Sequence, residues 1–334
     1  MPESDLVDRV RAGDVRATAR LLSWVEDGAP GLGAAMGALS AGGSAAHVIG
    51  VTGAPGVGKS TLTSALVGEY RRRGRRVGVL AVDPSSPFSG GALLGDRIRM
   101  QEHSTDPGVF IRSMASRGHL GGIAAATPQA IRVLEAAGYD VVLVETVGVG
   151  QSEVDVAATA DSTIVVLAPG MGDGIQAAKA GILEVGDVLC VNKSDRDGAE
   201  STAREIRQMV AMTPRAQGDW TPAVVLSVAS RGEVEPVVAA LDEREEWLAD
   251  AGHLRDRRRR RAAEEILAIA LGQVRRRLAE DDGTALDALA TRVADGTLDP
   301  FSAAVDLLEA NRAGEKVGLA GPAAIQVAPG PERE

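Results

Sequence analysis

The segment Gly53–Ser60 reads GAPGVGKS and matches the phosphate-binding pattern G-x-x-x-x-G-K-[ST] at every required position. The apolar run 47–52 before it predicts a β-strand, and the run 61–73 after it predicts a helix, which is the context that such a loop needs. Glycines let backbone N–H groups turn toward phosphate oxygens, and the following helix points its positive end at them. The pattern therefore predicts a nucleoside triphosphate site. The nucleotide contacts predicted in this stretch are Gly53, Ala54, Pro55, Gly56, Val57, Gly58, Lys59, Ser60 and Thr61.

A second motif, Asn192-Lys193-Ser194-Asp195, indicates which base the site holds. It follows the apolar run 187–191, which predicts a buried parallel strand that ends at the ligand edge of a sheet. The ionised carboxylate of Asp195 only accepts hydrogen bonds, so it suits the N1–H and 2-amino donors of guanine and is repelled by the N1 lone pair of adenine. We expect Asn192 to brace the loop and the Lys193 stem to cover one face of the base. The motif predicts GTP rather than ATP.

Strand-like and helix-like segments alternate between residues 47 and 250. This alternation predicts an α/β fold of the P-loop NTPase type, with a mostly parallel sheet and helices on both faces. The strands are predicted at 47–52, 76–82, 108–113, 139–145, 162–168, 187–192 and 223–227.

Helical segments are predicted on either side of this GTPase domain, which we place at 47–250. Residues 1–46 are expected to form an N-terminal extension, with one helix over 4–26, Ser4 as its N-cap and a Gly-rich linker after it. Residues 251–313 are predicted to be a helical dimerisation arm, with packing back on the sheet as the alternative, and 314–334 a flexible Gly/Pro-rich tail.

Composition predicts a soluble cytoplasmic protein. The formal net charge of −10 argues against a nucleic-acid partner held by bulk charge. The basic run 257–261 is the exception, and we interpret it as a solvated helix face or as a contact to an acidic partner rather than to RNA. The single cysteine, Cys190, lies in an apolar run and is predicted to belong to the core. Neither a signal-peptide pattern at the first residues nor an uninterrupted apolar run of membrane-spanning length is present, so we expect no membrane association.

Two further predicted strands end in acids that are candidates for the Mg²⁺ site. Asp83 lies near the phosphate-binding loop, where its carboxylate can hold a Mg²⁺-bound water or the attacking water. Glu145 takes the place where many P-loop proteins carry the Asp that holds Mg²⁺ through water, and the N–H of Gly148 can reach the γ-phosphate. The next residue is Val149, where Ras-type GTPases have a water-orienting Gln, so we expect slow intrinsic hydrolysis.

Two Gly-rich segments are predicted to act as further switches. The segment 89–97 places Asp96 after flexible glycines, which suits an element that orders around the γ-phosphate and Mg²⁺. The segment 169–179 carries Asp173 and Lys179, which are placed to sense the γ-phosphate from the far side.

Taken together, these motifs resemble those of the methylmalonyl-CoA mutase-associated GTPases. This family of metallochaperones belongs to the SIMIBI class of P-loop GTPases and has also been called the arginine/ornithine (LAO/AO) transport kinase family. The resemblance rests on DPSSP at 83–87, on glycines and LGDR within 89–97, and above all on VETVGVGQSE at 144–153. The segment 169–179 looks like the third switch of the family, and 192–195 matches its guanine motif.

The resemblance implies roles for individual residues. The metal ligands that it implies are Ser60, Asp83, Asp96 and Glu145. The catalytic residues predicted with it are Lys59, Asp83, Glu145, Gly148, Lys179 and Asp173. The predicted base-binding residues are Asn192, Lys193 and Asp195, together with the last contact loop Ser227, Val228 and Ala229. That loop departs from the usual Thr-Ser-Ala of the family, which keeps a backbone N–H from Ala229 to guanine O6 but removes a side-chain contact at the middle position.

Family members guard an adenosylcobalamin-dependent mutase, and GTP binding and hydrolysis gate cofactor delivery and the exchange of damaged cobalamin. The resemblance therefore implies a Mg²⁺-dependent GTPase that forms a homodimer and serves methylmalonyl-CoA mutase, with a cobalamin adenosyltransferase as a further partner. His103 and His119 have no ligand at metal-binding spacing, so we expect no direct cobalamin ligand from this chain.

Three other functions remain open at this point. The first is a P-loop kinase that phosphorylates an amino-acid transport binding protein, for which Arg112 and Arg117 are the nearby candidates to hold the acceptor. The second is a chaperone of a related acyl-CoA mutase. The third is a ribosome or RNA GTPase, which the negative charge disfavours.

Overall fold

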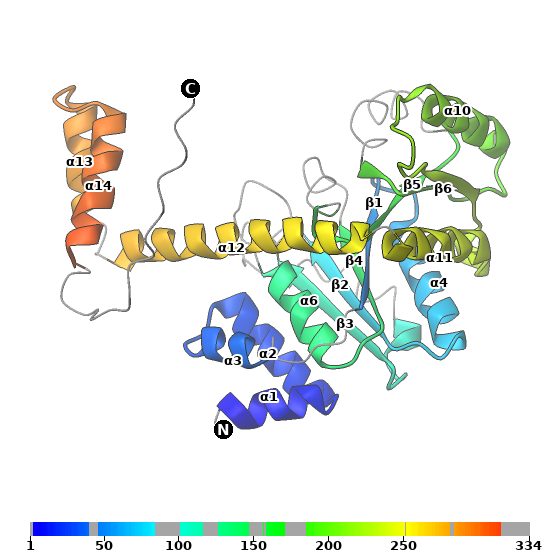
Figure 1. The fold of residues 1–334 in the computed structure, drawn as a ribbon, viewed down its shortest axis with the longest axis horizontal. Helices are drawn as coiled ribbons and strands as arrows, with labels where there is room; N and C mark the ends of the chain where they lie inside the picture. The colour runs from blue at the N-terminus through cyan, green and yellow to red at the C-terminus, as the bar shows by residue number, and fades with distance from the viewer. Residues whose placement is uncertain are drawn as a thin grey trace, which may run out of the picture. The chain divides into compact units, whose positions relative to one another are not determined.

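A seven-stranded, fully parallel sheet forms the core of the fold (Figure 1). Its strand order is β3-β2-β4-β1-β5-β6-β7. The strands are β1 (His47–Thr52), β2 (Val77–Asp83), β3 (Val109–Ala115), β4 (Val141–Thr146), β5 (Ser162–Leu167), β6 (Val188–Val191) and β7 (Ala223–Leu226). All seven predicted strands and the predicted α/β P-loop fold are confirmed. The prediction worked because a strand buried on both faces is a short, continuous aliphatic run.

The structure, a computed structural model, describes residues 3–39, 46–83, 101–115, 126–146, 156, 158–170, 185–250, 252–280 and 284–314. The chain divides into two compact units, Met1–Glu265 and Ile266–Glu334. The domain boundaries at 46, 250 and 313 stay predictions.

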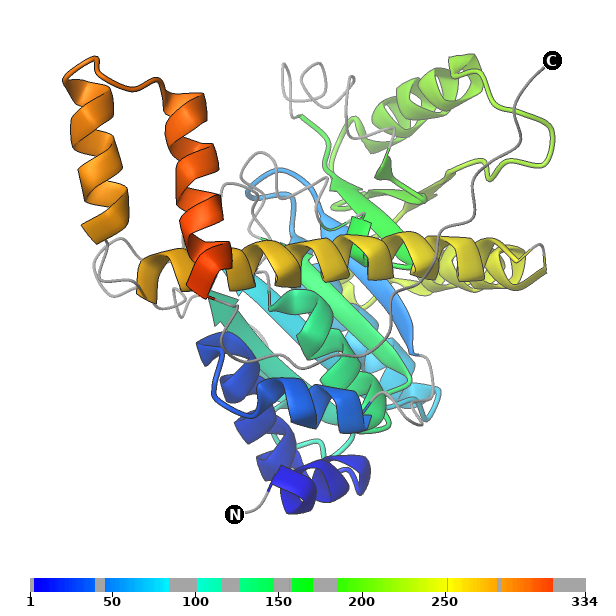
Figure 2. The same cartoon turned by 60° about the vertical axis from the view of Figure 1, so that its left-hand side comes forward.

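Helices cover both faces of the sheet, because successive strand residues point to opposite faces and both sets are apolar. One face packs against α4 (Lys59–Arg72) and α11 (Glu235–Asp250). The opposite face packs against α6 (Thr127–Ala136) and the N-terminal helices, and toward β7 against α10 (Ala199–Met212). Both views place the N-terminal helices beside α6 (Figures 1 and 2). Two short 3-10 helices, η1 (Gln101–His103) and η2 (Ala229–Arg231), complete this unit.

The N-terminal segment 4–26, predicted as one helix, is two helices. α1 (Glu3–Arg11) begins before Ser4, so Ser4 is not its N-cap, and α2 (Val15–Asp27) begins after a break at Gly13 and Asp14. Gly13 has φ +77°, a left-handed conformation that ends α1. The Asp14 side chain then accepts the N–H groups of Arg16 and Ala17 and caps α2.

The predicted linker after this segment also contains a helix, α3 (Leu32–Leu39). Its glycines lower helix propensity, which is why the sequence pattern favoured a linker. Ala35 and Leu39 are buried in the core that α1, α2 and α6 share, and Leu32 and Met36 pack against it. Tertiary packing therefore outweighs the weak local propensity.

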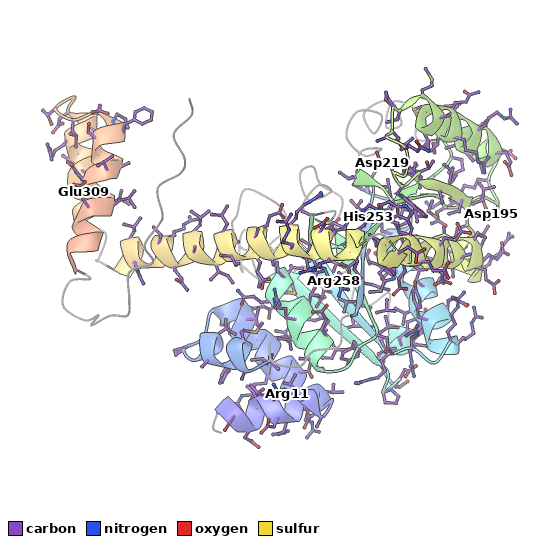
Figure 3. All side chains as sticks on the ribbon, viewed as in Figure 1. Arg11, Asp195, Asp219, His253, Arg258 and Glu309 are labelled. Carbon is purple, nitrogen blue, oxygen red and sulfur yellow. The ribbon has the colours of Figure 1, made fainter. Side chains whose placement is uncertain are left out.

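The basic run 257–261 lies on α12 (His253–Glu280), and part of it binds acids of the same chain. Asp161, directly before β5, has a side chain that is only 2% exposed and accepts the N–H of Val48 at 3.1 Å. Its carboxylate lies 3.0 Å from Arg258 Nη2 and 3.5 Å from Arg261 Nη1. Figure 3 labels Arg258 on the N-terminal part of α12. Arg258 and Arg261 therefore bind an acid of the same chain, Asp161 at the amino end of β5.

A second buried carboxylate, Asp187, lies directly before β6 and extends this ion-pair network. Its Oδ1 is 3.0 Å from Arg244 Nη2, its Oδ2 is 3.3 Å from Arg257 Nη2, and Oδ2 also accepts the N–H of Thr163 at 2.9 Å. Burial lowers the pKa of Arg244. Arg259 and Arg260 are exposed, so the solvated-face interpretation holds for these two residues alone.

The second unit contains the C-terminal part of α12 followed by α13 (Thr284–Ala294) and α14 (Pro300–Gly314). Its helices carry exposed apolar side chains. These are Ile266, Leu267, Leu271, Val274, Leu286, Phe301, Val305 and Leu308. In the described part of the chain, every helix is too short or too polar to cross a membrane.

Candidate nucleotide-binding site

The loop between β1 and α4 adopts a conformation that its glycines make possible. Gly53 has φ +137° and Gly58 has φ +100°, both in the region that side chains rarely adopt. A Cβ at Gly53 would lie 2.3 Å from the carbonyl oxygen of Val166, and a Cβ at Gly58 would lie 2.4 Å from Asn192 Nδ2. The loop therefore needs glycine at both positions, for space as well as for backbone conformation.

Lys59 begins α4, and its ammonium group lies over the loop. Its Nζ donates hydrogen bonds to the carbonyl oxygens of Gly53 at 2.7 Å and Ala54 at 3.1 Å. The side chain is buried, and in the P-loop pattern the lysine at this position reaches the β- and γ-phosphates. Thr61, the other side chain predicted at the start of α4, is exposed.

Ser60 and Glu145, two of the four predicted metal ligands, lie side by side. Ser60 Oγ donates to Glu145 Oε1 at 2.6 Å, and both side chains are buried. Parallel pairing places Glu145 level with Val51 of β1 and with Ala81 of β2. Three carboxyl strand ends thus meet here, and the backbone of Asp83 ends β2 at this edge.

Asn192 joins the phosphate-binding loop to the two loops after β6 and β7. Its Nδ2 donates to the carbonyl oxygen of Val57 at 2.9 Å, and its Oδ1 accepts the N–H of Ala229 at 3.1 Å. The side chain is 2% exposed, so both bonds are shielded from water. The expectation that Asn192 braces the loop agrees with this geometry. The N–H of Ala229 is engaged by Asn192 here, and its predicted contact with guanine O6 stays a prediction.

The turn after Asn192 has a defined conformation. Lys193 has φ +56°, a value found at no other non-glycine residue among those described, and its Nζ donates to the carbonyl oxygen of Gly56 at 2.6 Å. The N–H of Ser194 donates to the carbonyl oxygen of Ser227 at 3.0 Å. Asp195 follows with its carboxylate Oδ2 3.5 Å from Arg231 Nη2. The predicted base-reading acid is therefore presented by a turn that is tied to two neighbouring loops.

Residues 227–229 form the second of these loops. Ser227 Oγ donates to the carbonyl oxygen of Glu233 at 3.0 Å, and Val228 forms a bridge with Glu233. All three loop residues are buried. The hydroxyl of Ser227 therefore helps to fix the conformation of the loop.

Several predicted site residues lie outside the described part of the chain. These are Asp96, Gly148, Asp173 and Lys179, together with the side chain of Asp83. Val149, Arg117 and His119 also lie outside it.

Three other side chains have roles in packing or in polar contacts. Burial raises the pKa of Cys190 to about 12, so this core thiol stays protonated near neutral pH. Arg112 pairs with Glu26 and donates to Ser23 Oγ at 3.1 Å. His103 lies with its Nε2 3.1 Å from Ser64 Oγ on α4.

Sequence reasoning missed Arg231 as a neighbour of the site and Asp161 and Asp187 as anchors of α12. No local pattern marks these residues, because each one meets its partner only after distant segments are brought together. Asp161 and Asp187 share one feature that the sequence does show, which is a position directly before an aliphatic run.

Comparisons with known proteins agree with these features. A protein-family model described as "Methylmalonyl Co-A mutase-associated GTPase MeaB" matches residues 18–282. A protein of Pyrococcus horikoshii named as a GTPase is 44% identical over 311 residues, which cover 92% of this chain and 98% of that protein. A methylmalonic aciduria type A homolog, mitochondrial, from Caenorhabditis briggsae is 41% identical over 216 residues, covering 63% of this chain and 52% of that protein. The crystal structure of an LAO/AO transport system kinase is similar with a TM-score of 0.68 and 27% identity, covering 93% of this chain and 97% of that one.

Proposed function

This chain belongs to the methylmalonyl-CoA mutase-associated GTPase family, and we propose that it uses GTP hydrolysis to act as a chaperone of adenosylcobalamin-dependent methylmalonyl-CoA mutase. In this role it gates cofactor loading and protects or reactivates the mutase. The family match carries the proposal, and the relative named for methylmalonic aciduria supports the same metabolic context.

The GTP cycle would rest on the phosphate-binding loop and the guanine turn. Backbone N–H groups of Gly53–Ser60 would hold the phosphates, and the Lys59 ammonium would exchange its two carbonyl partners for β- and γ-phosphate oxygens. Asp195 would accept the N1–H and 2-amino groups of guanine, with the Lys193 stem along the base. The Asn192 bridge supports this assignment, because it holds the two halves of the site at a fixed separation.

The side chains at the strand ends fit Mg²⁺, which prefers hard oxygen ligands in a small shell. Ser60 Oγ and Glu145 Oε1 are buried and 2.6 Å apart, so both are within reach of one cation. Asp83 and Asp96 are proposed to complete the set. When bound, Mg²⁺ would neutralise charge that develops on the β- and γ-phosphate oxygens during cleavage.

Hydrolysis is proposed to be slow in the isolated chain and faster with the mutase. Water attacks the γ-phosphorus, and the bond to the β–γ bridging oxygen breaks to give GDP and phosphate. The valine side chain of Val149 has no group that orients water, so a partner has to reposition the switch residues. The residues proposed for that response are Gly148, Asp173 and Lys179.

Residues 251–313 are proposed to be the dimerisation arm. Its exposed apolar residues include Leu271 on α12 and Phe301 on α14, and a second copy of this chain would cover them. A cobalamin adenosyltransferase is proposed as a further partner, and we assign no cobalamin ligand to this chain.

The test compares phosphate release from GTP and from ATP, with and without methylmalonyl-CoA mutase. We expect GTP turnover to exceed ATP turnover and to rise when the mutase is added. Asp195→Asn should reduce the preference for GTP, whereas Arg259→Gln, an exposed change on α12, should leave turnover unchanged. Equal rates with and without saturating mutase would contradict the chaperone role.

A kinase that phosphorylates an amino-acid transport binding protein is the second candidate, because the similar solved structure is named as a transport system kinase. Such an enzyme needs cationic side chains to hold its acceptor. Arg112 is engaged by Glu26 and Ser23, which argues against that use. Phosphate transfer to a binding protein in place of release to water would favour the kinase. A chaperone of a related acyl-CoA mutase would instead be revealed by activation with that mutase alone.

A further inference from the structure

Arg231 lies beside the acid that is proposed to read the base. Its Nη2 is 3.5 Å from Asp195 Oδ2, and it is the last residue of η2, which begins in the loop 227–229. We propose that Arg231 is a positioning residue for guanine recognition, which orients the Asp195 carboxylate and balances its charge while the base covers it. This inference rests on the proposed guanine site.

The backbone around Arg231 places it in a fixed register with the guanine turn. The N–H of Arg231 donates to the carbonyl oxygen of Val228 at 2.9 Å, and Gly232 turns the chain with φ +73°. The N–H of Ala229, at the start of η2, donates to Asn192 Oδ1. One hydrogen-bonded unit therefore carries both the arginine and the loop that faces the turn.

A carboxylate can serve an arginine and guanine at the same time. Its two oxygens offer about four lone-pair sites, of which the N1–H and 2-amino groups of guanine use two. Arg231 approaches Oδ2, so a further lone pair of that oxygen remains for the base. The nearby cation of Lys193 is directed to the carbonyl oxygen of Gly56, and within the described residues the ion pair of Asp195 is with Arg231.

The effect of Arg231 should be larger in the nucleotide complex than in the free chain. Asp195 and Arg231 have side-chain exposures of 35% and 60%, and water weakens such a surface pair. A planar base lying against Asp195 removes part of that water and strengthens the electrostatic attraction between Asp195 and Arg231. Arg231 should thus raise affinity for guanine nucleotides through Asp195.

The experiment is a double-mutant cycle on nucleotide binding by the full chain. Dissociation constants of GDP and of IDP, which lacks the 2-amino group, are measured for the wild type, Arg231→Gln, Asp195→Asn and the double variant. We expect Arg231→Gln to weaken GDP binding about three- to fivefold, to weaken IDP binding less, and to have no effect in the Asp195→Asn background. Arg231→Lys should recover part of the loss.

The matched control is Arg259→Gln, another exposed arginine that pairs with an acid of its own helix, and it should leave both constants unchanged. Unfolding temperatures of all variants report whether the fold is intact. The proposal is overturned if Arg231→Gln weakens GDP and IDP equally, acts undiminished without Asp195, or tightens binding. A wild-type chain that binds ADP as well as GDP would instead refute the guanine site itself, together with this role.

Discussion

Replacing Asp161 with alanine should destabilise the first unit by about 3 kcal/mol. Its carboxylate is 2% exposed and accepts the N–H of Val48, while Arg258 and Arg261 lie within 3.5 Å of it. Removing one partner of a buried ion pair costs about 3–5 kcal/mol, because the remaining charge is left without compensation. The two arginines are 25% and 14% exposed, so water offsets part of the cost and the lower end of that range applies.

The assay is thermal unfolding followed by circular dichroism, with urea unfolding as a second measurement. A loss of about 3 kcal/mol should lower the unfolding temperature by about 6–12 °C in a unit of this size. The control is Asp197→Ala, an exposed acid whose removal should change stability by no more than about 0.5 kcal/mol.

We attribute the expected loss of stability to the positive charges that remain when Asp161 is removed, and a combined variant tests this cause. Arg258→Met and Arg261→Met together with Asp161→Ala should cost less than the sum of the separate changes, since the two cations that Asp161 pairs with are then removed as well. Strict additivity, or a shift for Asp161→Ala as small as that of the control, would contradict a stabilising role of this ion-pair network.

Two further predictions concern packing and pH. Gly50→Ala should destabilise the fold by about 1–3 kcal/mol because its Cβ would lie 2.2 Å from Val156 Cγ1, and Val156→Ala should recover part of that loss in urea unfolding; an equal loss in both backgrounds would contradict the clash. The hydrogen bond from His47 holds the pKa of Glu245 below its usual value, so this pair stabilises the fold above the unfolded carboxyl pKa and the contribution is lost as the pH falls through the lower folded pKa. The unfolding temperatures of wild type and Glu245→Gln should therefore differ at pH 7 and approach each other as the pH falls below the ordinary glutamate pKa of about 4.3, and a constant difference would argue against the linkage.

The strands and the phosphate-binding loop could be predicted from sequence because their requirements are local. A strand such as β4 is recognised in the sequence as an unbroken aliphatic run. Gly53, Gly58 and Lys59 belong to a sequence pattern that is specific to phosphate-binding loops. The turn at Asn192 could also be predicted from the sequence, since it directly follows such a strand.

Other features were mispredicted or missed because they depend on partners far along the chain. The helix α3 has a weak local signal, and only its burial against the core of α1, α2 and α6 stabilises it. Asp14 is a typical N-cap residue, so the sequence offers a signal for the break before α2. The apolar periodicity continues on both sides of Asp14 and favours an unbroken helix instead. The ligand segments around Asp96 and Asp173 lie outside the described residues, and their roles stay predictions.

The class of fold, the phosphate loop and the turn at 192–195 can be predicted from the sequence, because neighbouring residues within single segments encode them. The strand order, the contact between Ser60 and Glu145, and the pairing of Arg258 with Asp161 are visible only in the folded structure. These features join segments that lie far apart in the chain. Their energies depend on burial and distance, and both quantities exist only once the sheet has assembled.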